Sequence, residues 1–194
     1  MASAALKVAT LSVVEPKIRR MSIERFRQWR PRDGWKYDWN DGKISKYKKM
    51  VSEKQRYIVQ NLSDFFYEKG LHKQGGLTPE SEMAYDDKRY RIPDMAFYTY
   101  EQTKAAAQGQ HTIAAFVIEI ISDSDYAKDI ETKLLEYFKN DVQVVWHIMP
   151  YQKLVKVYTS PRDVSICLEE DICSAKPALP DFEITVNQIF ELKD

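Results

Sequence analysis

The chain has 194 residues, of which 44% are hydrophobic and 30% are charged, and its formal net charge is zero. These values are typical of a folded, water-soluble protein, and a chain of this length can enclose a sizeable core. No apolar run approaches the roughly 20 residues of a membrane-spanning helix, which argues against a membrane protein. We expect a single domain over residues 22–194, preceded by a poorly ordered arm over residues 1–21.

Charged residues are unevenly distributed along the chain. Residues 1–60 contain 15 Lys or Arg and 6 Asp or Glu, whereas residues 61–194 contain 14 and 23. Basic residues mixed with aromatic ones, as in the first segment, suit a nucleic-acid backbone. A solvated helical face, or pairing with the acidic remainder of the fold, accounts for the same pattern, so both interpretations stay open. The two cysteines, Cys167 and Cys173, favour a reducing cytoplasm over a disulfide scaffold.

The first third of the chain predicts two helices and a hairpin. Ser22 is suited to cap a short helix from Ile23 to Trp29, and two short strands flank the turn at residues 40–42. A longer helix is predicted from about Ser52 to Glu68, because its apolar residues recur at three- and four-residue spacing. Gly70 is a natural end for this helix.

The middle of the chain predicts a sheet. Leu77 to Tyr85 and Tyr90 to Tyr98 are expected to be paired strands joined by a turn at residues 86–88. Residues 102–110 are either a loop or a short helical insert. The almost unbroken apolar run from Ile113 to Ile121 is typical of a central strand that is buried on both faces.

A second long helix is expected from about Tyr126 to Asn140, with N-cap chemistry supplied by residues 122–125. The remaining predictions are three strands, a loop and a closing helix, over residues 142–148, 154–158, 164–168, 177–182 and 185–190. This order of elements predicts a mixed α/β architecture rather than a regular βαβ repeat.

Glu119 is the most informative residue, because it lies inside a strongly apolar strand. Burying an unpaired charge there would cost several kcal/mol, so Glu119 needs a cation, a partner or an open cleft. Asp94 follows Pro93 on a neighbouring predicted strand. Two such carboxylates can share a hard divalent metal such as Mg²⁺, with the main-chain carbonyl of Ile120 as a third oxygen ligand. A structural ion pair at Glu119 and a turn role for Asp94 are the plainer alternatives.

Lys133 lies four residues after Asp129, so the two share one face of the second long helix. A lysine at the border of the apolar stripe either extends to solvent or points toward the carboxylates on the strand before it. The three histidines stand in unrelated contexts without ligand spacing, and we expect none of them to be catalytic: His72, His111 and His147.

Four stretches, taken together, resemble a known family: residues 91–97 (RIPDMAF), 117–122 (VIEIIS), 129–137 (DIETKLLEY) and 144–146 (VVW). Their order and spacing are similar to those of the Uma-type putative restriction endonucleases, bacterial members of the PD-(D/E)XK nuclease superfamily. The likeness covers roughly residues 22–192. It implies a restriction-endonuclease-like central mixed sheet flanked by helices, with a metal site at one edge.

The resemblance also implies roles for particular residues. Asp94 matches the aspartate of the Pro-Asp motif, and Glu119 matches the acidic residue of the second motif. The superfamily lysine usually comes two residues after that acid, where this chain has Ile121, so Lys133 becomes the candidate lysine. Two positions depart from the family pattern. Asp38 replaces a glutamate and keeps a supporting carboxylate, whereas Lys54 replaces a histidine and cannot act as an imidazole.

The expected function is metal-dependent hydrolysis of phosphodiester bonds in DNA. Asp94, Glu119 and Ile120 would hold Mg²⁺ or Mn²⁺, with Lys133 and Asp38 in catalytic roles. DNA is the expected partner, cutting both strands suits a homodimer, and the expected location is the bacterial cytoplasm. One alternative is an inactive nuclease-fold module that binds DNA or protein. Another is an α/β protein whose carboxylates are only structural.

Overall fold

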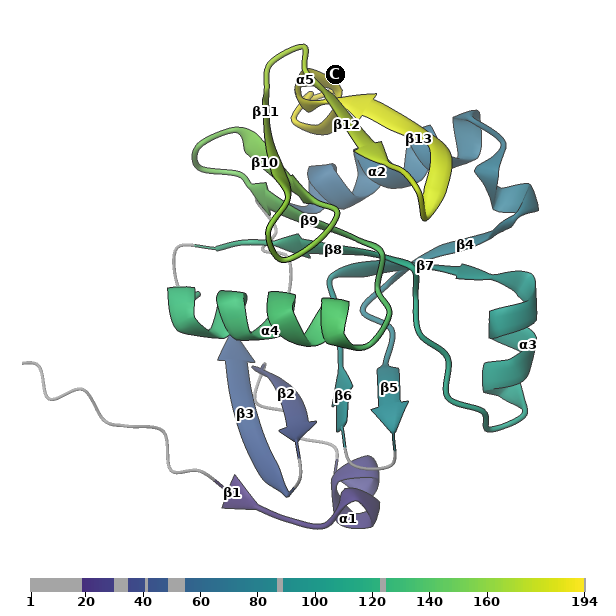
Figure 1. Cartoon of the computed structure of the whole chain (residues 1–194), viewed down its shortest axis with the longest axis vertical. Helices are drawn as coiled ribbons and strands as arrows, with labels where there is room; N and C mark the ends of the chain where they lie inside the picture. The colour runs from purple at the N-terminus through teal and green to yellow at the C-terminus, as the bar shows by residue number, and fades with distance from the viewer. Residues whose placement is uncertain are drawn as a thin grey trace, which may run out of the picture.

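The structure is a computed structural model, and it describes residues 19–29, 35–40, 42–48, 55–86, 89–122 and 125–193 (Figure 1). A six-stranded sheet forms its centre. In spatial order its strands are β11 (Val164–Leu168), β10 (Leu154–Tyr158), β9 (Val144–Met149), β8 (Phe116–Ile120), β7 (Met95–Thr99) and β4 (Gly75–Pro79). β8 and β9 are parallel and are connected through helix α4 (Ala127–Lys139), whereas the other neighbours are antiparallel. The predicted mixed sheet is therefore confirmed.

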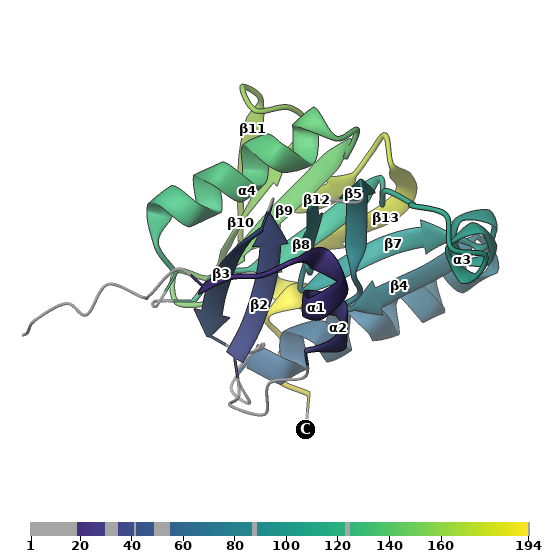
Figure 2. The same cartoon turned by 90° about the horizontal axis from the view of Figure 1, so that it is seen from below.

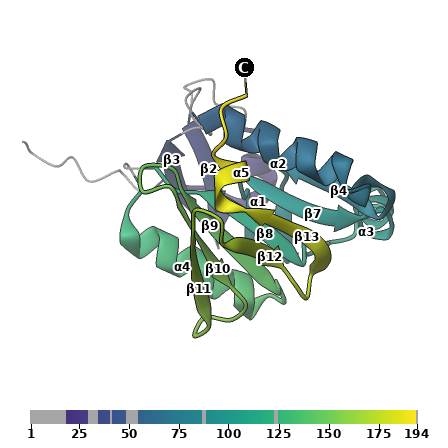
Figure 3. The ribbon, with the colours of Figure 1, turned by 90° about the horizontal axis from the view of Figure 1, so that it is seen from above.

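Helices cover both faces of this central sheet, as Figures 1 and 3 show. Helix α4 packs on one face. The opposite face carries α2 (Arg56–Glu68), the short α5 (Val186–Ile189), and a two-stranded sheet of β12 (Ile172–Ala175) and β13 (Leu179–Thr185). Side chains alternate along β8, so Phe116, Ile118 and Ile120 pack on the α2 side while Val117 packs on the α4 side. The same alternation directs Glu119 toward α4.

The helices begin and end where local chemistry requires. α2 is followed by Gly70, whose φ of 70° is the left-handed conformation that glycine adopts readily. A short 3-10 turn, η2 (Leu71–Lys73), comes next. Residues 102–110, predicted as either a loop or a helical insert, belong mostly to α3 (Tyr100–Ala107), which starts with a Thr99–Gln102 capping box. Among the described helices, none combines the length and the apolarity needed to cross a bilayer.

A second, smaller sheet lies beside the central one and is seen most clearly in Figure 2. Its strands, in spatial order, are β1 (Arg19–Arg20), β3 (Lys43–Lys48), β2 (Trp35–Asn40), β6 (Arg89–Arg91) and β5 (Met83–Asp86). α1 (Ile23–Gln28) packs on it, and the Ser22 hydroxyl caps this helix by accepting from the Arg25 N–H, as predicted. The sheet has its own small core of Phe26, Trp39, Ile44 and Tyr90.

The two segments predicted as strands at 77–85 and 90–98 do pair with each other, but the prediction that each is one continuous strand is wrong, because both are broken. The first divides into β4 and β5, the second into β6 and β7, and each pair is shared between the two sheets. The break in the second strand falls at Pro93, which has no N–H to donate to a ladder. A backbone bond from Glu80 N–H to the Asp94 carbonyl, 3.1 Å long, holds the two bends together.

Two further predictions are corrected. Residues 177–182 were expected to be a loop, but 179–182 belong to β13, whose Phe182 side chain is fully buried. The N-cap of α4 is Tyr126, whose side chain makes no capping hydrogen bond, and residues 123 and 124 of the predicted capping segment lie outside the described residues. The Asp125 carboxylate instead accepts from the N–H and hydroxyl of Ser122, at 2.7 and 2.9 Å.

Candidate functional site

Asp94 lies at the point where β7 begins and where the ladder with β8 is interrupted. Met95 and Ile118 form the last pair of the β7–β8 ladder, and a continued antiparallel register would place Asp94 opposite Glu119 and Pro93 opposite Ile120. The Asp94 carboxylate accepts a 2.7 Å hydrogen bond from the Ile120 N–H. The carboxylate thereby takes the place of a backbone acceptor for the Ile120 N–H, and this hydrogen bond holds the Asp94 side chain beside β8.

The carbonyl of Ile120 is left in an unusual position by this arrangement. Ile121 N–H bonds to Ile148 on β9, so the peptide groups of Ile120 point the other way, toward β7. The residue opposite is Pro93, which cannot donate. The sheet therefore provides no donor for the Ile120 carbonyl, in the immediate neighbourhood of the Asp94 carboxylate. The Pro-Asp sequence thus both supplies a carboxylate and withholds a ladder donor from a main-chain oxygen.

Glu119 is buried, with 7% of its surface exposed, and α4 provides its partners. The Tyr137 hydroxyl donates to Glu119 Oε1 at 2.5 Å. Lys133 Nζ lies 3.4 Å from Oε1 and 3.5 Å from Oε2. The buried charge is therefore compensated by a cation and a hydroxyl, which meets the requirement that the sequence imposed.

Lys133 points toward the Glu119 carboxylate rather than out to solvent. Its side chain is 18% exposed and that of Glu119 is 9% exposed, so the pair is largely removed from water. Asp129, one turn earlier on α4, is exposed. Of the two orientations that the sequence left open for Lys133, the structure shows the one directed at the site.

A second ion pair fixes the position of α4 over the sheet. Arg91 Nε and Nη2 donate to Glu136 Oε2 at 2.8 and 2.5 Å, and Arg91 is only 5% exposed. Glu136 lies between Lys133 and Tyr137 in the sequence of α4. The pair therefore anchors the part of the helix that contacts Glu119.

His147 is the unexpected neighbour of the site. The parallel register pairs Glu119 with His147 on β9, and the antiparallel register pairs His147 with Lys156 on β10. His147 is 3% exposed, and its ring packs edge-on against Tyr158 with centroids 5.0 Å apart. Burial, followed by the positive charges of Lys156 and Lys133, lowers the pKa of His147 to about 4, so the imidazole is neutral at pH 7.

This depressed pKa predicts a stability that depends on pH. An unfolded histidine has a pKa near its usual 6.5. Between this pH and about 4, the histidine is therefore protonated in the unfolded chain but neutral in the folded chain. The free energy of unfolding should fall as the pH drops from about 6.5 to about 4, by up to roughly 3 kcal/mol from this residue. Urea unfolding across this range should show a shallower pH dependence for His147→Gln. An equal slope in both proteins would contradict the assignment.

Two predicted positions cannot be compared with the site. Asp38 belongs to β2 and pairs with Ser45, but its side chain lies outside the described part of the structure, as does Lys54. Conversely, the sequence did not indicate Tyr137 as a site residue, because it fits the apolar stripe of α4. The placement of His147 depends on the β8–β9 register, which no local pattern specifies.

The oxygen atoms of Asp94, Glu119 and Ile120 are better ligands for Mg²⁺ or Mn²⁺ than for Zn²⁺. Within the described residues, no three His, Cys, Asp or Glu side chains gather closely enough to hold a metal ion. Zn²⁺ requires three or four such ligands, whereas Mg²⁺ is held by one or two carboxylates and keeps several waters. Asp94, Glu119 and the Ile120 carbonyl offer only hard oxygen donors. They suit Mg²⁺ or Mn²⁺ rather than Zn²⁺.

Comparisons with known proteins identify a structure with a similar fold and a family to which the sequence belongs. The crystal structure of a putative nuclease from Anabaena variabilis ATCC 29413 aligns with a TM-score of 0.70 and 16% sequence identity, covering 88% of this chain and 97% of that one. The fold is therefore a nuclease-like mixed α/β fold. Residues 23–187 match the Uma2 family, described as "Putative restriction endonuclease", and the chain belongs to that family. The resemblance seen in the sequence is confirmed. A comparison with curated proteins finds no match.

Proposed function

We propose that this protein is a metal-dependent endonuclease that hydrolyses phosphodiester bonds in DNA. The observation that carries the proposal is the hydrogen bond that holds the Asp94 carboxylate on the Ile120 N–H, directly next to Glu119 at the end of the β7–β8 ladder. A second observation supports it, since the lysine of the site approaches Glu119 from α4. Membership of the family described as "Putative restriction endonuclease" supports the same reaction class.

Each residue has a distinct part in this proposal. Asp94, Glu119 and the Ile120 carbonyl would hold Mg²⁺ or Mn²⁺, which supplies Lewis acidity toward a phosphate oxygen and lowers the pKa of a bound water. The Lys133 ammonium, beside Glu119, would stabilise negative charge that develops on the phosphate in the transition state. Tyr137 orients the Glu119 carboxylate by donating to one of its oxygens.

The basic segment at the start of the chain would contact the DNA backbone. Arg20 and Lys43 are paired positions on β1 and β3, and both side chains are exposed. Exposed cations on a sheet suit phosphate contacts that do not depend on base sequence. Binding through them would weaken as the salt concentration rises.

An inactive nuclease-fold module that binds DNA or protein is the second candidate. The observation that favours it is the closed contact at Glu119, whose charge is already balanced by Lys133 and Tyr137. The substitutions at Asp38 and Lys54 relative to the family pattern point the same way.

Calorimetric titration with Mn²⁺, run beside a plasmid cleavage assay, separates the two candidates. For the endonuclease we expect saturable Mn²⁺ binding and cleavage that stops when EDTA is added. Metal binding without cleavage, or DNA retention without metal binding, would favour the inactive module. Neither metal binding nor DNA binding would reject both candidates.

A further inference from the structure

Strand β11 forms an edge of the central sheet and carries apolar side chains that face solvent. Val164, Ile166 and Leu168 alternate along the strand and are 47%, 57% and 47% exposed. In the described part of the chain, β11 pairs with β10 alone. An exposed apolar edge strand is a site for pairing with another strand, and proteins usually protect such edges with charges or prolines. Here the protection is missing from the middle of the strand.

The backbone groups available on this edge can be identified from the pairing with β10. Thr159 N–H bonds to the Asp163 carbonyl, so residues 163, 165 and 167 direct their peptide groups toward β10. Residues 164, 166 and 168 direct theirs outward. Leu168 is already satisfied, because its N–H donates to the Asp171 carboxylate at 3.0 Å and its carbonyl accepts from Asp171 N–H at 2.8 Å. The outward groups of Val164 and Ile166 remain for a partner strand.

We propose that two copies of this chain associate through β11, in antiparallel orientation about a two-fold axis at Ser165. This register places Val164 of each copy opposite Ile166 of the other. All four outward N–H and C=O groups of each strand then find partners, and the contact between Leu168 and Asp171 stays intact. The exposed side chains of Val164 and Ile166 bury one another across the axis. The proposal does not depend on the proposed nuclease activity.

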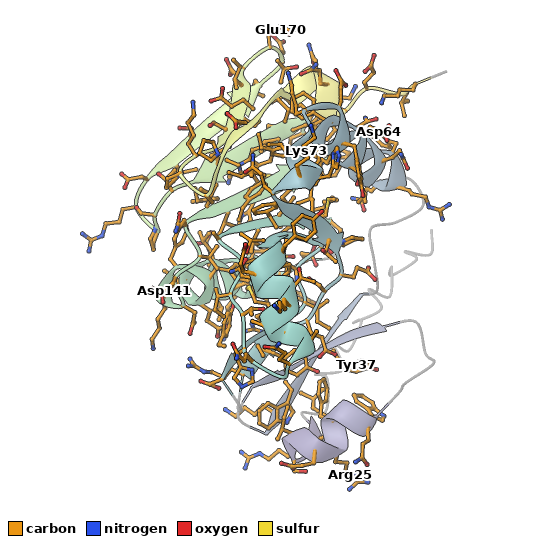
Figure 4. The ribbon with its side chains drawn as sticks, turned by 90° about the vertical axis from the view of Figure 1, so that its right-hand side faces the viewer. Arg25, Tyr37, Asp64, Lys73, Asp141 and Glu170 are labelled. Atoms are coloured by element: carbon orange, nitrogen blue, oxygen red, sulfur yellow. The ribbon has the colours of Figure 1, made fainter. Side chains whose placement is uncertain are left out.

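Charges at the two ends of β11 favour this arrangement. Arg162 and Asp163 precede the strand, the Asp163 carboxylate accepting from the Ser160 hydroxyl of its own turn, and the acidic turn Glu169-Glu170-Asp171 follows it. Antiparallel pairing brings the Arg162 end of one copy beside the acidic turn of the other, so opposite charges meet twice. Figure 4 shows Glu170 at the end of the molecule opposite Arg25 of α1 and Tyr37 of the smaller sheet. Association at β11 therefore leaves the end of the molecule that carries Arg25 and Tyr37 accessible to another partner.

Sedimentation of the full chain tests the association. We expect the wild-type protein to sediment at twice its 22.8 kDa chain mass and Ile166→Lys at the single mass. Circular dichroism checks that this variant, changed only at an exposed side chain, remains folded. Tyr67→Lys is the matched control, because Tyr67 is 65% exposed and lies on α2, away from β11. This variant should stay dimeric. A monomeric wild-type protein, or a dimeric Ile166→Lys, would overturn the proposal.

Cysteine cross-linking tests the register. Ser165→Cys should form a disulfide-linked dimer in a mild oxidant, because residues that face each other across the axis have Cα atoms about 4.5 Å apart. Ile166→Cys should not, since its two copies lie two residues out of line and more than about 7 Å apart. Burial raises the pKa of both native thiols, Cys167 and Cys173, so they should not compete. Equal cross-linking of both variants, or linkage through position 166 alone, would contradict the register.

Discussion

Glu119→Gln and Asp94→Asn should each reduce Mg²⁺-dependent DNA cleavage by about a hundredfold or more. Each change keeps the shape of the side chain and removes one negative oxygen donor, and a metal ion contributes several kcal/mol to the transition state. Asp94→Asn can still accept from the Ile120 N–H through its amide oxygen. Glu119→Gln leaves Lys133 without its counter-charge. Both variants should therefore lose Mn²⁺ binding in calorimetry as well as cleavage.

Glu131→Gln is the matched control for these variants. Glu131 is an exposed carboxylate on α4, the same helix that carries Lys133 and Tyr137. Its neutralisation should leave both cleavage and Mn²⁺ binding unchanged. Thermal unfolding shows whether each variant is still folded. Wild-type activity in a folded Asp94→Asn or Glu119→Gln protein would refute the proposed metal site.

The periodic parts of the fold could be predicted from the sequence. The helical spacing of Ile58, Leu62 and Phe65 fixes which face of α2 is buried, and the apolar run around Val117 marks the central strand. The breaks between β4 and β5 and between β6 and β7 were missed, although Pro93 marks the second one. Strand propensity does not show where a chain leaves one sheet and joins another. β13 was missed since Pro180 and Asp181 resemble a loop, whereas an edge strand tolerates them.

The neighbouring positions of β7 and β8 could also be predicted, because these two sheet strands follow one another along the chain. The partners of Glu119 were harder to foresee. A buried tyrosine such as Tyr137 serves the core with its ring and the site with its hydroxyl, and only the ring follows the helical period. His147 comes beside Glu119 through a parallel pairing of strands that are distant in sequence. Long-range register is set by the whole sheet rather than by local residues.

Arg91→Met should lower the free energy of unfolding by about 3 kcal/mol, because it removes the cation that the largely buried Glu136 carboxylate pairs with. The side chains of Arg91 and Glu136 are 6% and 22% exposed, so Glu136 keeps only partial contact with water after the change. The loss should also reduce any DNA cleavage, since Glu136 anchors the segment of α4 that contacts Glu119. Urea unfolding at pH 7 measures the first effect, and the cleavage assay measures the second.

Two companion variants show whether the effect comes from a stranded charge. Lys193→Met removes an exposed pair with Asp64, whose side chains are 54% and 42% exposed, and should cost under about 1 kcal/mol. The double variant Arg91→Met with Glu136→Met removes both buried charges and should regain much of the lost stability, because no carboxylate is left unpaired. If Arg91→Met costs no more than Lys193→Met, the Arg91–Glu136 pair does not anchor α4. If the double variant is as unstable as the single one, packing by Arg91 rather than its charge holds the helix.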